Sequence, residues 1–553
     1  MKLRAFLFLW VVVIVHHTTF GQVEPSLTNK QLRLLDSIAC QDVPKSAPGI
    51  ATAIIRDGKV IYQKVAGYAN LKDSTQIDPK TRFNIASNGK QFTALAILVL
   101  EDNKKLKLTD DIRTYLPNVL PKYPNKLTIE NLLNHSSGIR DVYDLWSLQG
   151  KTWWKKSFNN KDALKLIEQQ RDLNFEPGTK YKYSNTNYIL LALIIEKVTG
   201  KSFVKYTKEL FTQLNMPDTA FEDDYTTIEE PIAKAYFNFS TWKNYNWIWN
   251  VCGDGNLFST LEDQIAWESL LQNKNNSVIK REIIEKSQTL TNNTKIKNYG
   301  YGLEFGDYKG LNYKFHEGAT GAWKATTIRF PEQNIAMITL TNTGKATPNT
   351  QTRQMADVLL KLKESSKYFA TKPSEVGPFV SDESLLGIYA TEENFTFQFV
   401  KKDTALYLKR IGRNDVLLER ENDNTLHQTY DADFKQEFTQ NAQGEMEVTA
   451  YYTSHAPYKL KKSTSDFSKF DFKSINGTFI NTETKALIKI QFTDEKNYKV
   501  KIGSQKNLNG ILLSTTKLLV ENYVLEFVNT NTSVETLFLS GDRIQNVKFE
   551  RIK

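Results

Sequence analysis

The stretch FNIASNGKQFTA, residues 83–94, contains the residues that decide the fold and the chemistry of this chain. Ser87 and Lys90 form an S-x-x-K unit at the start of a predicted helix. Side chains three positions apart on a helix share a face, so the Lys90 amine can reach the Ser87 hydroxyl and take its proton. A helix N-terminus also offers unpaired N–H groups and a positive dipole end to a developing oxyanion. The pattern therefore predicts an activated serine nucleophile.

Two later stretches carry further polar motifs. Residues 175–185, FEPGTKYKYSN, contain a Y-x-N unit at Tyr183 and Asn185, and residues 315–321, FHEGATG, contain an H-x-G unit at His316. S-x-x-K, Y-x-N and H-x-G in this order resemble the serine β-lactamase and penicillin-recognising enzyme family. The order is most similar to the class C-like branch of that family, which includes D-aminopeptidases, DD-carboxypeptidases and esterases.

The resemblance runs from about residue 27 to about residue 363 and implies a role for each motif residue. It implies that Ser87 is the acylated nucleophile and that Lys90 and Tyr183 transfer the proton. A tyrosine, which normally titrates near ~10, acts as a base only beside a cation, so the choice between Lys90 and Tyr183 stays open. The resemblance implies an oxyanion hole from the backbone N–H groups of Ser87 and Ala319. It also implies that the substrate is bound by Asn185, His316, Gly318 and Ala319.

His316 stands where many members of the family carry the lysine of K-T-G. An unperturbed histidine, with a pKa near ~6.5, is mostly neutral at physiological pH, whereas a lysine is cationic. We therefore expect neutral amides and esters to suit this site better than substrates with a carboxylate. Of the other polar residues, His135 is interpreted as a structural hydrogen-bonding residue, and the Gly253-Asp254-Gly255 turn as a matter of backbone geometry.

The N-terminus predicts export. Lys2 and Arg4 precede an apolar run from Ala5 to Val15, and Gly21 stands before a plausible cleavage point, so residues 1–21 are predicted to be a signal peptide. The run is too short to span a bilayer, which needs roughly 20 apolar residues, and we expect no stable membrane span after cleavage. The protein would then be periplasmic or secreted. Loss of Lys2 and Arg4 lowers the formal net charge from +10 by two, to +8, which favours anionic neighbours.

Other classes of function find little support in the sequence. We expect no cofactor and no metal, because histidines are few and no H-E-x-x-H motif occurs. Nothing resembles a nucleic-acid-binding motif, so no nucleic-acid partner is expected. Cys40 and Cys252 are predicted to be free thiols, since the resemblance places them apart.

The chain reads as several domains, and its fold class is predicted to be α+β followed by all-β modules. Residues 22–364 should form an antiparallel sheet flanked by helices, with a helical lobe and the site between sheet and lobe. The expected elements are a helix over 27–38, two strands over 49–69 around Asp57-Gly58, a helix from Ser87 to Leu100, a helix over 188–198, strands over 312–316, 323–330 and 334–342, and a helix over 351–362.

A linker is predicted at residues 365–381, and the helical pattern disappears beyond it. Gly387-Ile388-Tyr389 recurs as Gly477-Thr478-Phe479, an offset of 90 residues (477 − 387). Apolar and polar residues alternate through both copies, which is typical of half-buried strands. We therefore predict two small barrel-like all-β domains, at 382–463 and 470–553. Such a pair also occurs in the D-aminopeptidase relatives that the resemblance indicates.

Taken with the predicted export, the motifs favour a serine hydrolase that cleaves a small amide or ester through an acyl-enzyme on Ser87. Its partners would be small-molecule or peptide substrates of the D-amino-acid type, including peptidoglycan fragments. Two alternatives remain, a class C-like β-lactamase or broad esterase, and a catalytically inactive peptidoglycan- or penicillin-binding protein. The sequence leaves open the substrate, the choice of base, the role of the β domains and the oligomeric state.

Overall fold

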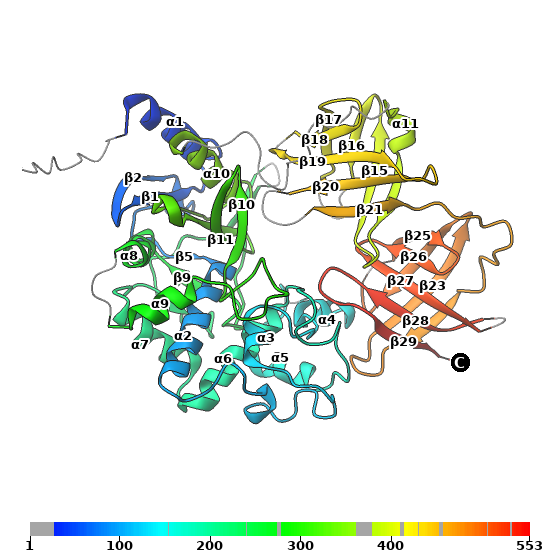
Figure 1. The fold of residues 1–553 in the computed structure, drawn as a ribbon, viewed down its shortest axis with the longest axis horizontal. Coiled ribbons are helices and arrows are strands. Elements are labelled where there is room, and N and C mark those ends of the chain that lie inside the picture. Colours follow the sequence, from blue (N-terminus) through cyan, green and yellow to red (C-terminus); the bar gives the residue numbers. More distant parts are fainter. Residues whose placement is uncertain are drawn as a thin grey trace, which may run out of the picture.

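The computed structural model describes residues 27–552 with short gaps, and Figure 1 shows an α+β body beside two β-barrels. The positions outside the described residues are 1–26, 153, 239–240, 274–277, 361–378, 410–413, 430, 453–456, 506, 531–532 and 553. The predicted signal peptide, residues 1–21, and most of the predicted linker, residues 365–381, therefore lie outside the described residues.

A six-stranded antiparallel sheet forms the centre of the body, in the order β10-β11-β12-β13-β1-β2. Its strands are β1 (Ile50–Arg56), β2 (Lys59–Ala66), β10 (Glu304–Tyr308), β11 (Leu311–Thr320), β12 (Trp323–Phe330) and β13 (Ile335–Thr341). Asp57 and Gly58 join β1 to β2 with φ angles of 51° and 73°, the left-handed conformations that a tight hairpin requires. Because β1 pairs with β13, the two ends of the α+β body meet in one sheet.

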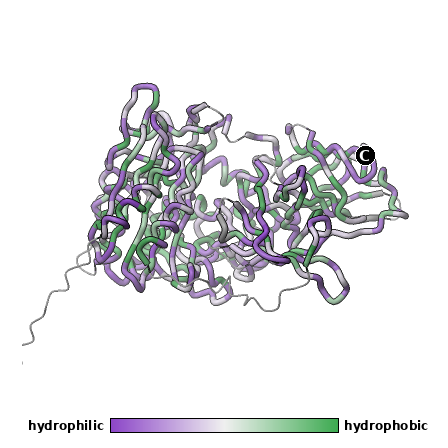
Figure 2. Tube along the Cα trace, turned by 90° about the horizontal axis from the view of Figure 1, so that it is seen from above, coloured by the Kyte–Doolittle hydropathy of each residue, from purple (hydrophilic) through white to green (hydrophobic). Residues whose placement is uncertain are grey.

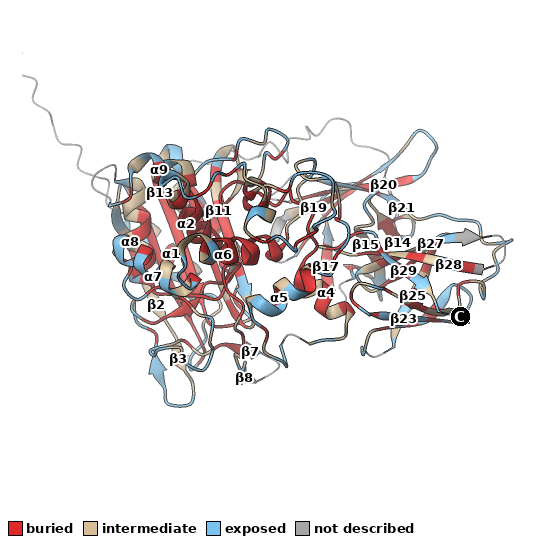
Figure 3. Cartoon of the chain, turned by 90° about the horizontal axis from the view of Figure 1, so that it is seen from below, coloured by how far each residue is buried: buried red, intermediate tan, exposed pale blue. Residues whose placement is uncertain are grey.

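Helices cover both faces of this sheet. One face carries α1 (Asn29–Cys40) and α10 (Pro348–Leu359), whose apolar residues Leu35 and Met355 join a cluster with β1 and β13. The other face carries α8 (Leu261–Gln272), which packs on β1 and β13. All residues of β13 are buried as a result, and Figure 3 shows the buried strands between helices with exposed outer faces.

A helical lobe lies beside the sheet, with α2 (Lys90–Asp102) and α6 (Asn185–Thr199) packed together at its centre. Both helices are apolar nearly all round, and most of their residues are buried, as such a pattern predicts. The other helices of the body are η1 (Ala86–Gly89), η2 (Ile112–Thr114), α3 (Ile129–Leu133), α4 (Val142–Leu148), α5 (Asn160–Ile167), α7 (Phe203–Gln213), α9 (Arg281–Ser287) and η3 (Pro331–Gln333).

Short strands complete the body around the sheet and the lobe. They are β3 (Tyr68–Asn70), β4 (Thr75–Gln76), β5 (Phe83–Asn84), β6 (Ala220–Phe221), β7 (Tyr236–Asn238), β8 (Trp242–Asn244) and β9 (Leu257–Ser259). The strands β5, β9 and β6 form a small sheet of their own, and β5 leads directly into the turn that carries Ser87. The fold of the body is thus the predicted β-lactamase-like α+β fold.

Several elements begin or end a few residues from their predicted bounds, as α1 and α6 do, and two of these differences have a clear cause. β11 was expected to end at His316 but continues to Thr320, because residues 316–320 pair with β12. The H-x-G unit therefore lies inside a strand. The predicted helix over 351–362 runs instead from Pro348 to Leu359, since a proline fits the first turn of a helix, where its missing N–H costs nothing.

Two closed eight-stranded antiparallel barrels follow the body. The first barrel, preceded by α11 (Asp382–Leu385), consists of β14 (Gly387–Ala390), β15 (Thr396–Lys402), β16 (Ala405–Leu408), β17 (Val416–Arg420), β18 (Thr425–Gln428), β19 (Asp431–Gln440), β20 (Met446–Tyr451) and β21 (Tyr458–Lys462). The second consists of β22 (Gly477–Ile480), β23 (Leu487–Asp494), β24 (Asn497–Ile502), β25 (Leu508–Ser514), β26 (Lys517–Val520), β27 (Tyr523–Thr530), β28 (Ser533–Ser540) and β29 (Val547–Arg551).

The two barrels pack differently against their surroundings. In each barrel the first strand pairs with the last, so no edge strand is left open. The first barrel encloses an apolar cluster of its own, which includes Phe399 and Val448. The core of the second barrel, which includes Phe479 and Leu537, is continuous with that of the α+β body. Figure 2 shows hydrophobic stretches alternating with hydrophilic ones in the α+β body and in the barrels.

Two smaller predictions can be compared with this structure. Cys40 and Cys252 are both free thiols, as the sequence predicts. In the described part of the chain, no helix combines the length and the apolar character that a membrane span needs.

Candidate active site

The predicted nucleophile, Ser87, lies on the short 3₁₀ turn η1 immediately before α2. Ala86 precedes it with a φ of 49°, a left-handed conformation that is strained for a residue with a Cβ. In a 3₁₀ turn, side chains three positions apart eclipse one another, so the hydroxyl of Ser87 points at the side chain of Lys90. Ser87 is partly exposed, whereas Lys90 is fully buried.

The Lys90 Nζ atom makes three polar contacts. It lies 3.0 Å from Ser87 Oγ and 3.0 Å from Asn185 Oδ1, and it also contacts the backbone carbonyl oxygen of Asp254. A neutral amine has two N–H donors and one lone pair. The carbonyl and amide oxygens accept the two donors, which leaves the lone pair for the Ser87 hydroxyl.

Burial also favours the neutral form of Lys90. Desolvation lowers the pKa of its amine to about 7, opposed by Asp254 and assisted by the nearby positive charge of Arg543. An ordinary lysine titrates near ~10.4 and is almost entirely protonated at neutral pH. At this position, a large fraction of Lys90 can therefore accept a proton at physiological pH.

Tyr183 lies over the same pair of residues. Lys90 Nζ is 5.0 Å from the centre of the Tyr183 ring, and the Tyr183 hydroxyl is hydrogen-bonded to Ser87. Burial raises the pKa of Tyr183 well above its ordinary value, although Arg543 and the hydrogen bond to Ser87 act in the opposite direction. The opposite shifts of Lys90 and Tyr183 favour Lys90 as the proton acceptor, a choice that the sequence left open.

Asn185, at the start of α6, links Lys90 to a buried carboxylate. Its side-chain oxygen accepts from Lys90, while its side-chain nitrogen lies 3.0 Å from Asp141 Oδ2. The backbone N–H of Asn185 donates to the same oxygen of Asp141 at 2.7 Å. This geometry orients Lys90, and the predicted contact of Asn185 with a substrate remains a prediction.

The H-x-G unit on β11 lies against the Ser87 turn. A Cβ added to Gly318 would lie 2.1 Å from the Ile85 carbonyl oxygen and 3.2 Å from the Ser87 nitrogen, so only glycine fits there. The backbone of β11 thus reaches the amide of Ser87, where the predicted oxyanion hole requires it. Ala319, whose N–H is the second predicted donor, follows in the strand and is exposed.

His316 is buried and neutral. Its Nδ1–H donates to the carbonyl oxygen of Glu317 at 2.7 Å, and its Nε2 lies 3.0 Å from the Tyr299 hydroxyl, which donates to it. Burial lowers the pKa of His316 to about 3, and the positive charge of Lys90 acts in the same direction. His316 therefore brings no positive charge to the site, as expected for a histidine that stands in the place of a lysine.

His135 belongs to the aromatic surroundings of Tyr183 rather than to the proton pathway. Its Nδ1 accepts from the Ser184 backbone N–H at 3.3 Å and lies 3.0 Å from the Asn187 side-chain nitrogen. Its ring centre is 4.3 Å from that of Tyr183. These contacts agree with its interpretation as a structural residue.

Four charged residues near the site were missed by the sequence reasoning: Asp141, which binds Asn185, and Asp254, Glu304 and Arg543. Asp254 supplies the carbonyl that binds Lys90, and its carboxylate accepts from the Tyr143 hydroxyl at 2.8 Å. The sequence analysis interpreted the Gly253-Asp254-Gly255 turn as a matter of backbone geometry. That interpretation accounts for the position of the Asp254 carbonyl but gives its carboxylate no role. Glu304, at the start of β10, and Arg543, in the second barrel, have no local motif that marks them.

A cavity of about 1170 Å³ opens beside Tyr183 where the three parts of the molecule meet. The body contributes Tyr181–Tyr183, Asn298 and Glu304, the first barrel contributes Ala390–Thr396, Glu447 and Tyr458–Lys461, and the second contributes Asn522 and Gly541–Arg543. Burial raises the pKa of Glu304 to about 8, with repulsion from Glu317 adding to the effect. The lining carries both charges, which suits polar or zwitterionic ligands. Among the described residues, no group of His, Cys, Asp or Glu side chains could hold a metal ion.

A serine paired with a buried amine, rather than with a histidine, is typical of serine hydrolases of the S-x-x-K class. The chain belongs to the beta-lactamase family, whose sequence pattern matches residues 35–360. The matched region contains Ser87, Lys90, Tyr183 and His316.

Among its relatives is the D-aminopeptidase of Brucella anthropi, 29% identical over 305 residues, which cover 53% of this chain and 56% of that protein. Protein flp of Staphylococcus aureus is 29% identical over 327 residues, covering 57% of this chain and 64% of that protein. The matches thus span between half and two thirds of the length of these relatives.

Two solved structures share the fold. The octameric penicillin-binding protein homologue from Pyrococcus abyssi matches with a TM-score of 0.55 and 23% identity, covering 78% of this chain and 99% of that one. SurE matches with a TM-score of 0.51 and 15% identity, covering 95% of this chain and 98% of that one. At these identities the likeness concerns the fold, which in SurE extends over nearly the whole chain.

Proposed function

We propose that this protein is an exported serine hydrolase that cleaves a small amide or ester through an acyl-enzyme on Ser87. The proposed substrates are D-amino-acid peptides or peptidoglycan fragments. The observation that carries the proposal is the 3.0 Å contact between Lys90 Nζ and Ser87 Oγ, made by an amine whose pKa is lowered to about 7. The family membership and the relative named D-aminopeptidase support the substrate class.

The proposed reaction has two steps. Ser87 Oγ attacks the substrate carbonyl carbon while its proton passes to Lys90, and the oxyanion is bound by the backbone N–H groups of Ser87 and Ala319. The bond to the leaving amine or alcohol then breaks, and Tyr183 donates the proton that this group needs and is reprotonated by Lys90. A water molecule hydrolyses the acyl-enzyme by the reverse proton transfers and restores Ser87.

The first prediction concerns pH. Neutral Lys90 is the active form, so the rate at which a fluorophosphonate labels Ser87 should fall about tenfold per pH unit once the pH lies well below 7. The probe has no group that titrates in this range, so the acid limb reports the enzyme alone. A labelling rate that stays constant from pH 8 to pH 5 would contradict the assignment of Lys90 as base.

The second prediction concerns substrates. D-amino-acid amides, short esters, D-Ala-D-Ala peptides and nitrocefin should be compared on the wild type and on Ser87→Ala. Because His316 is neutral, carboxylate substrates lack one charge-assisted hydrogen bond, which is worth roughly 1.5–3 kcal/mol. We expect amides or esters to be preferred by about ten- to hundredfold.

Other results of this panel would favour the alternatives. A wild type that hydrolyses nitrocefin far faster than the amides and esters would be a β-lactamase. A protein that binds penicillin without hydrolysing any of the four substrates would be a binding protein. The export part of the proposal rests on residues 1–21 and is tested separately, by N-terminal sequencing of the mature protein from a periplasmic or culture fraction.

A further inference from the structure

The loop between β28 and β29, residues 541–546, reaches from the second barrel to the candidate active site. The guanidinium of Arg543 lies 5.1 Å from the centre of the Tyr183 ring. Its Nη1 lies 3.9 Å from Asp141 Oδ2, the oxygen that also holds Asn185. The side chain is 38% exposed and lines the cavity beside Tyr183. A residue of the C-terminal barrel therefore faces the proton-transfer residues of the body.

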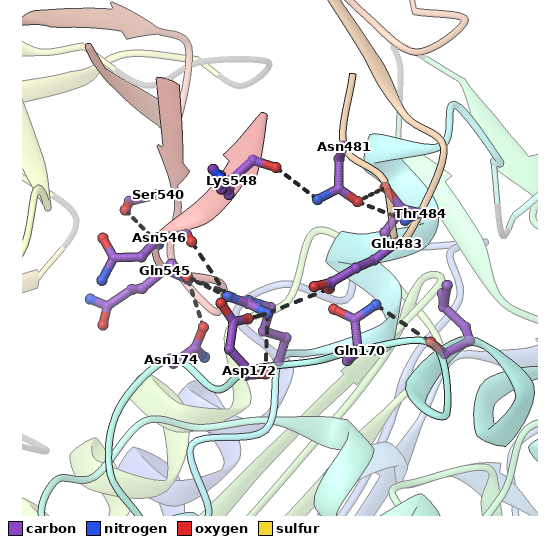
Figure 4. A network of polar contacts seen from close by, with 12 residues as sticks. Gln170, Asp172, Asn174, Asn481, Glu483, Thr484, Ser540, Gln545, Asn546 and Lys548 are labelled. Atoms are coloured by element: carbon purple, nitrogen blue, oxygen red, sulfur yellow. Dashed lines mark hydrogen bonds and ion pairs between the residues drawn. The ribbon is translucent and has the colours of Figure 1, made fainter. Parts of the chain in front are cut away.

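The loop is held in this position by buried polar contacts rather than by chance proximity. Asn174 of the body donates to the Arg543 carbonyl oxygen at 3.1 Å and accepts from the Gln545 N–H at 2.7 Å. Figure 4 shows Asn174 and Asp172 facing Gln545 and Asn546 across this junction. The Asp141 N–H adds a contact of 3.4 Å to the Arg543 carbonyl oxygen. Both ends of the Arg543 backbone segment are thus tied to the body.

Arg140 of the body also holds the loop of residues 541–546 in place. Its side chain is 1% exposed and contacts Asp172, while its Nη2 donates to the carbonyl oxygens of Gln545 at 3.3 Å and Asn546 at 3.4 Å. A buried guanidinium that loses its acceptors is costly, so these contacts oppose undocking of the loop. The second barrel and the body also share a continuous apolar core, which holds the two parts together.

We propose that Arg543 is a positioning residue of the active site, whose fixed positive charge adds to burial in keeping Lys90 neutral and stabilises negative charge on Tyr183 during proton transfer. The proposal rests on the proposed function, because it concerns the same proton transfer. It assigns to the second barrel a part in catalysis that acts through Lys90 and Tyr183. His316 stands at the position of the K-T-G lysine and brings no positive charge. Arg543 places a positive charge beside the site from the second barrel instead.

The sign of the effect follows from electrostatics. A positive charge disfavours a second one on Lys90 and favours a phenolate at Tyr183, so it lowers the pKa of both groups. Removing the charge raises both, whichever of the two groups accepts the proton. The other titratable or charged groups around Tyr183 and Arg543 include Lys90, His135, Asp141, Asp144, Tyr181, Tyr188, Asp254, Tyr299, Glu304, His316 and Asp542. Of these, the carboxylates act against Arg543 and Lys90 acts with it on Tyr183.

The test is the pH dependence of Ser87 labelling in full-length variants. In Arg543→Met the acid limb should move to higher pH by about one unit, whereas Arg543→Lys should keep it close to the wild-type position. Lys489→Met removes one charge from an exposed position of the same barrel and should leave the limb unmoved. Asn174→Ala removes two contacts to the loop without changing any charge. It should shift the acid limb of the labelling curve to higher pH, but by less than Arg543→Met does.

The outcomes separate this proposal from the proposed function. If the wild type is not labelled on Ser87, the proposed function fails. If it is labelled but Arg543→Met keeps the wild-type limb while its melting temperature is unchanged, the role of Arg543 is wrong. If Arg543→Met instead raises only KM, and only for substrates with a carboxylate, then Arg543 binds substrate and the proposal is overturned.

Discussion

Replacing Ser87 with alanine is expected to abolish covalent labelling and to lower hydrolysis by roughly 10⁴–10⁶-fold, the loss typical of a removed nucleophile. The Ser87 hydroxyl is the group that both Lys90 and Tyr183 contact, and no other residue in that arrangement could replace it. Because the change removes one oxygen atom from a partly exposed side chain, the fold should persist. Intact-mass analysis after fluorophosphonate treatment should show one adduct on the wild type and none on Ser87→Ala.

The matched control is Ser74→Ala, in an exposed turn of the body. It should keep both the adduct and the activity. Peptide mapping of the wild-type adduct should place it within residues 83–94. An adduct of the same stoichiometry on Ser87→Ala would show that another residue is acylated, and the assignment of the nucleophile would then be wrong.

Lys90→Met and Tyr183→Phe should each lower the acylation rate by roughly 10²–10⁴-fold, and the double variant should be about as slow as the slower single one. The two groups act on one hydroxyl as one proton pathway, so breaking it twice adds little. Methionine is preferred to alanine at position 90 because Lys90 is fully buried and alanine would leave a cavity. Single-turnover labelling rates measure the effect without interference from product release.

Lys105→Met, on the exposed stretch beyond α2, is the control for a lost lysine. Melting temperatures of all variants should be recorded, because Lys90→Met leaves the Asp254 carbonyl and the Asn185 side chain without their donor. If the loss in the double variant equals the product of the two single losses, Lys90 and Tyr183 act independently, and the shared proton pathway is refuted.

Much of the fold follows from local sequence signals. Asp57-Gly58 dictates a hairpin, the all-round apolar segments after Ser87 and Asn185 dictate buried helices, and Gly200 ends the second of them in a left-handed cap. The 90-residue repeat of alternating strands dictates two similar barrels, although closure of each barrel is a tertiary property. Strand ends were less predictable, since β11 extends through Gly318 only because β12 is there to pair with it.

The site could be predicted only in part. The i, i+3 spacing of Ser87 and Lys90 is enough to bring these two together, and their 3.0 Å contact agrees with it. The direction of the proton transfer was not predictable, because it depends on how far burial shifts the pKa of Lys90 and of Tyr183. Arg543 was out of reach altogether, since its approach to Tyr183 depends on how a distant barrel docks.

The cavity shared by three parts of the molecule has a consequence for selection by size. Its walls come from the α+β body and from both barrels, and Tyr183 is part of its lining. A volume of about 1170 Å³ is on the scale of pockets that hold one small ligand, so under the proposed function short substrates should be cleaved faster than long ones. Under the proposed function, the barrels would then limit the length of the substrates that reach Tyr183.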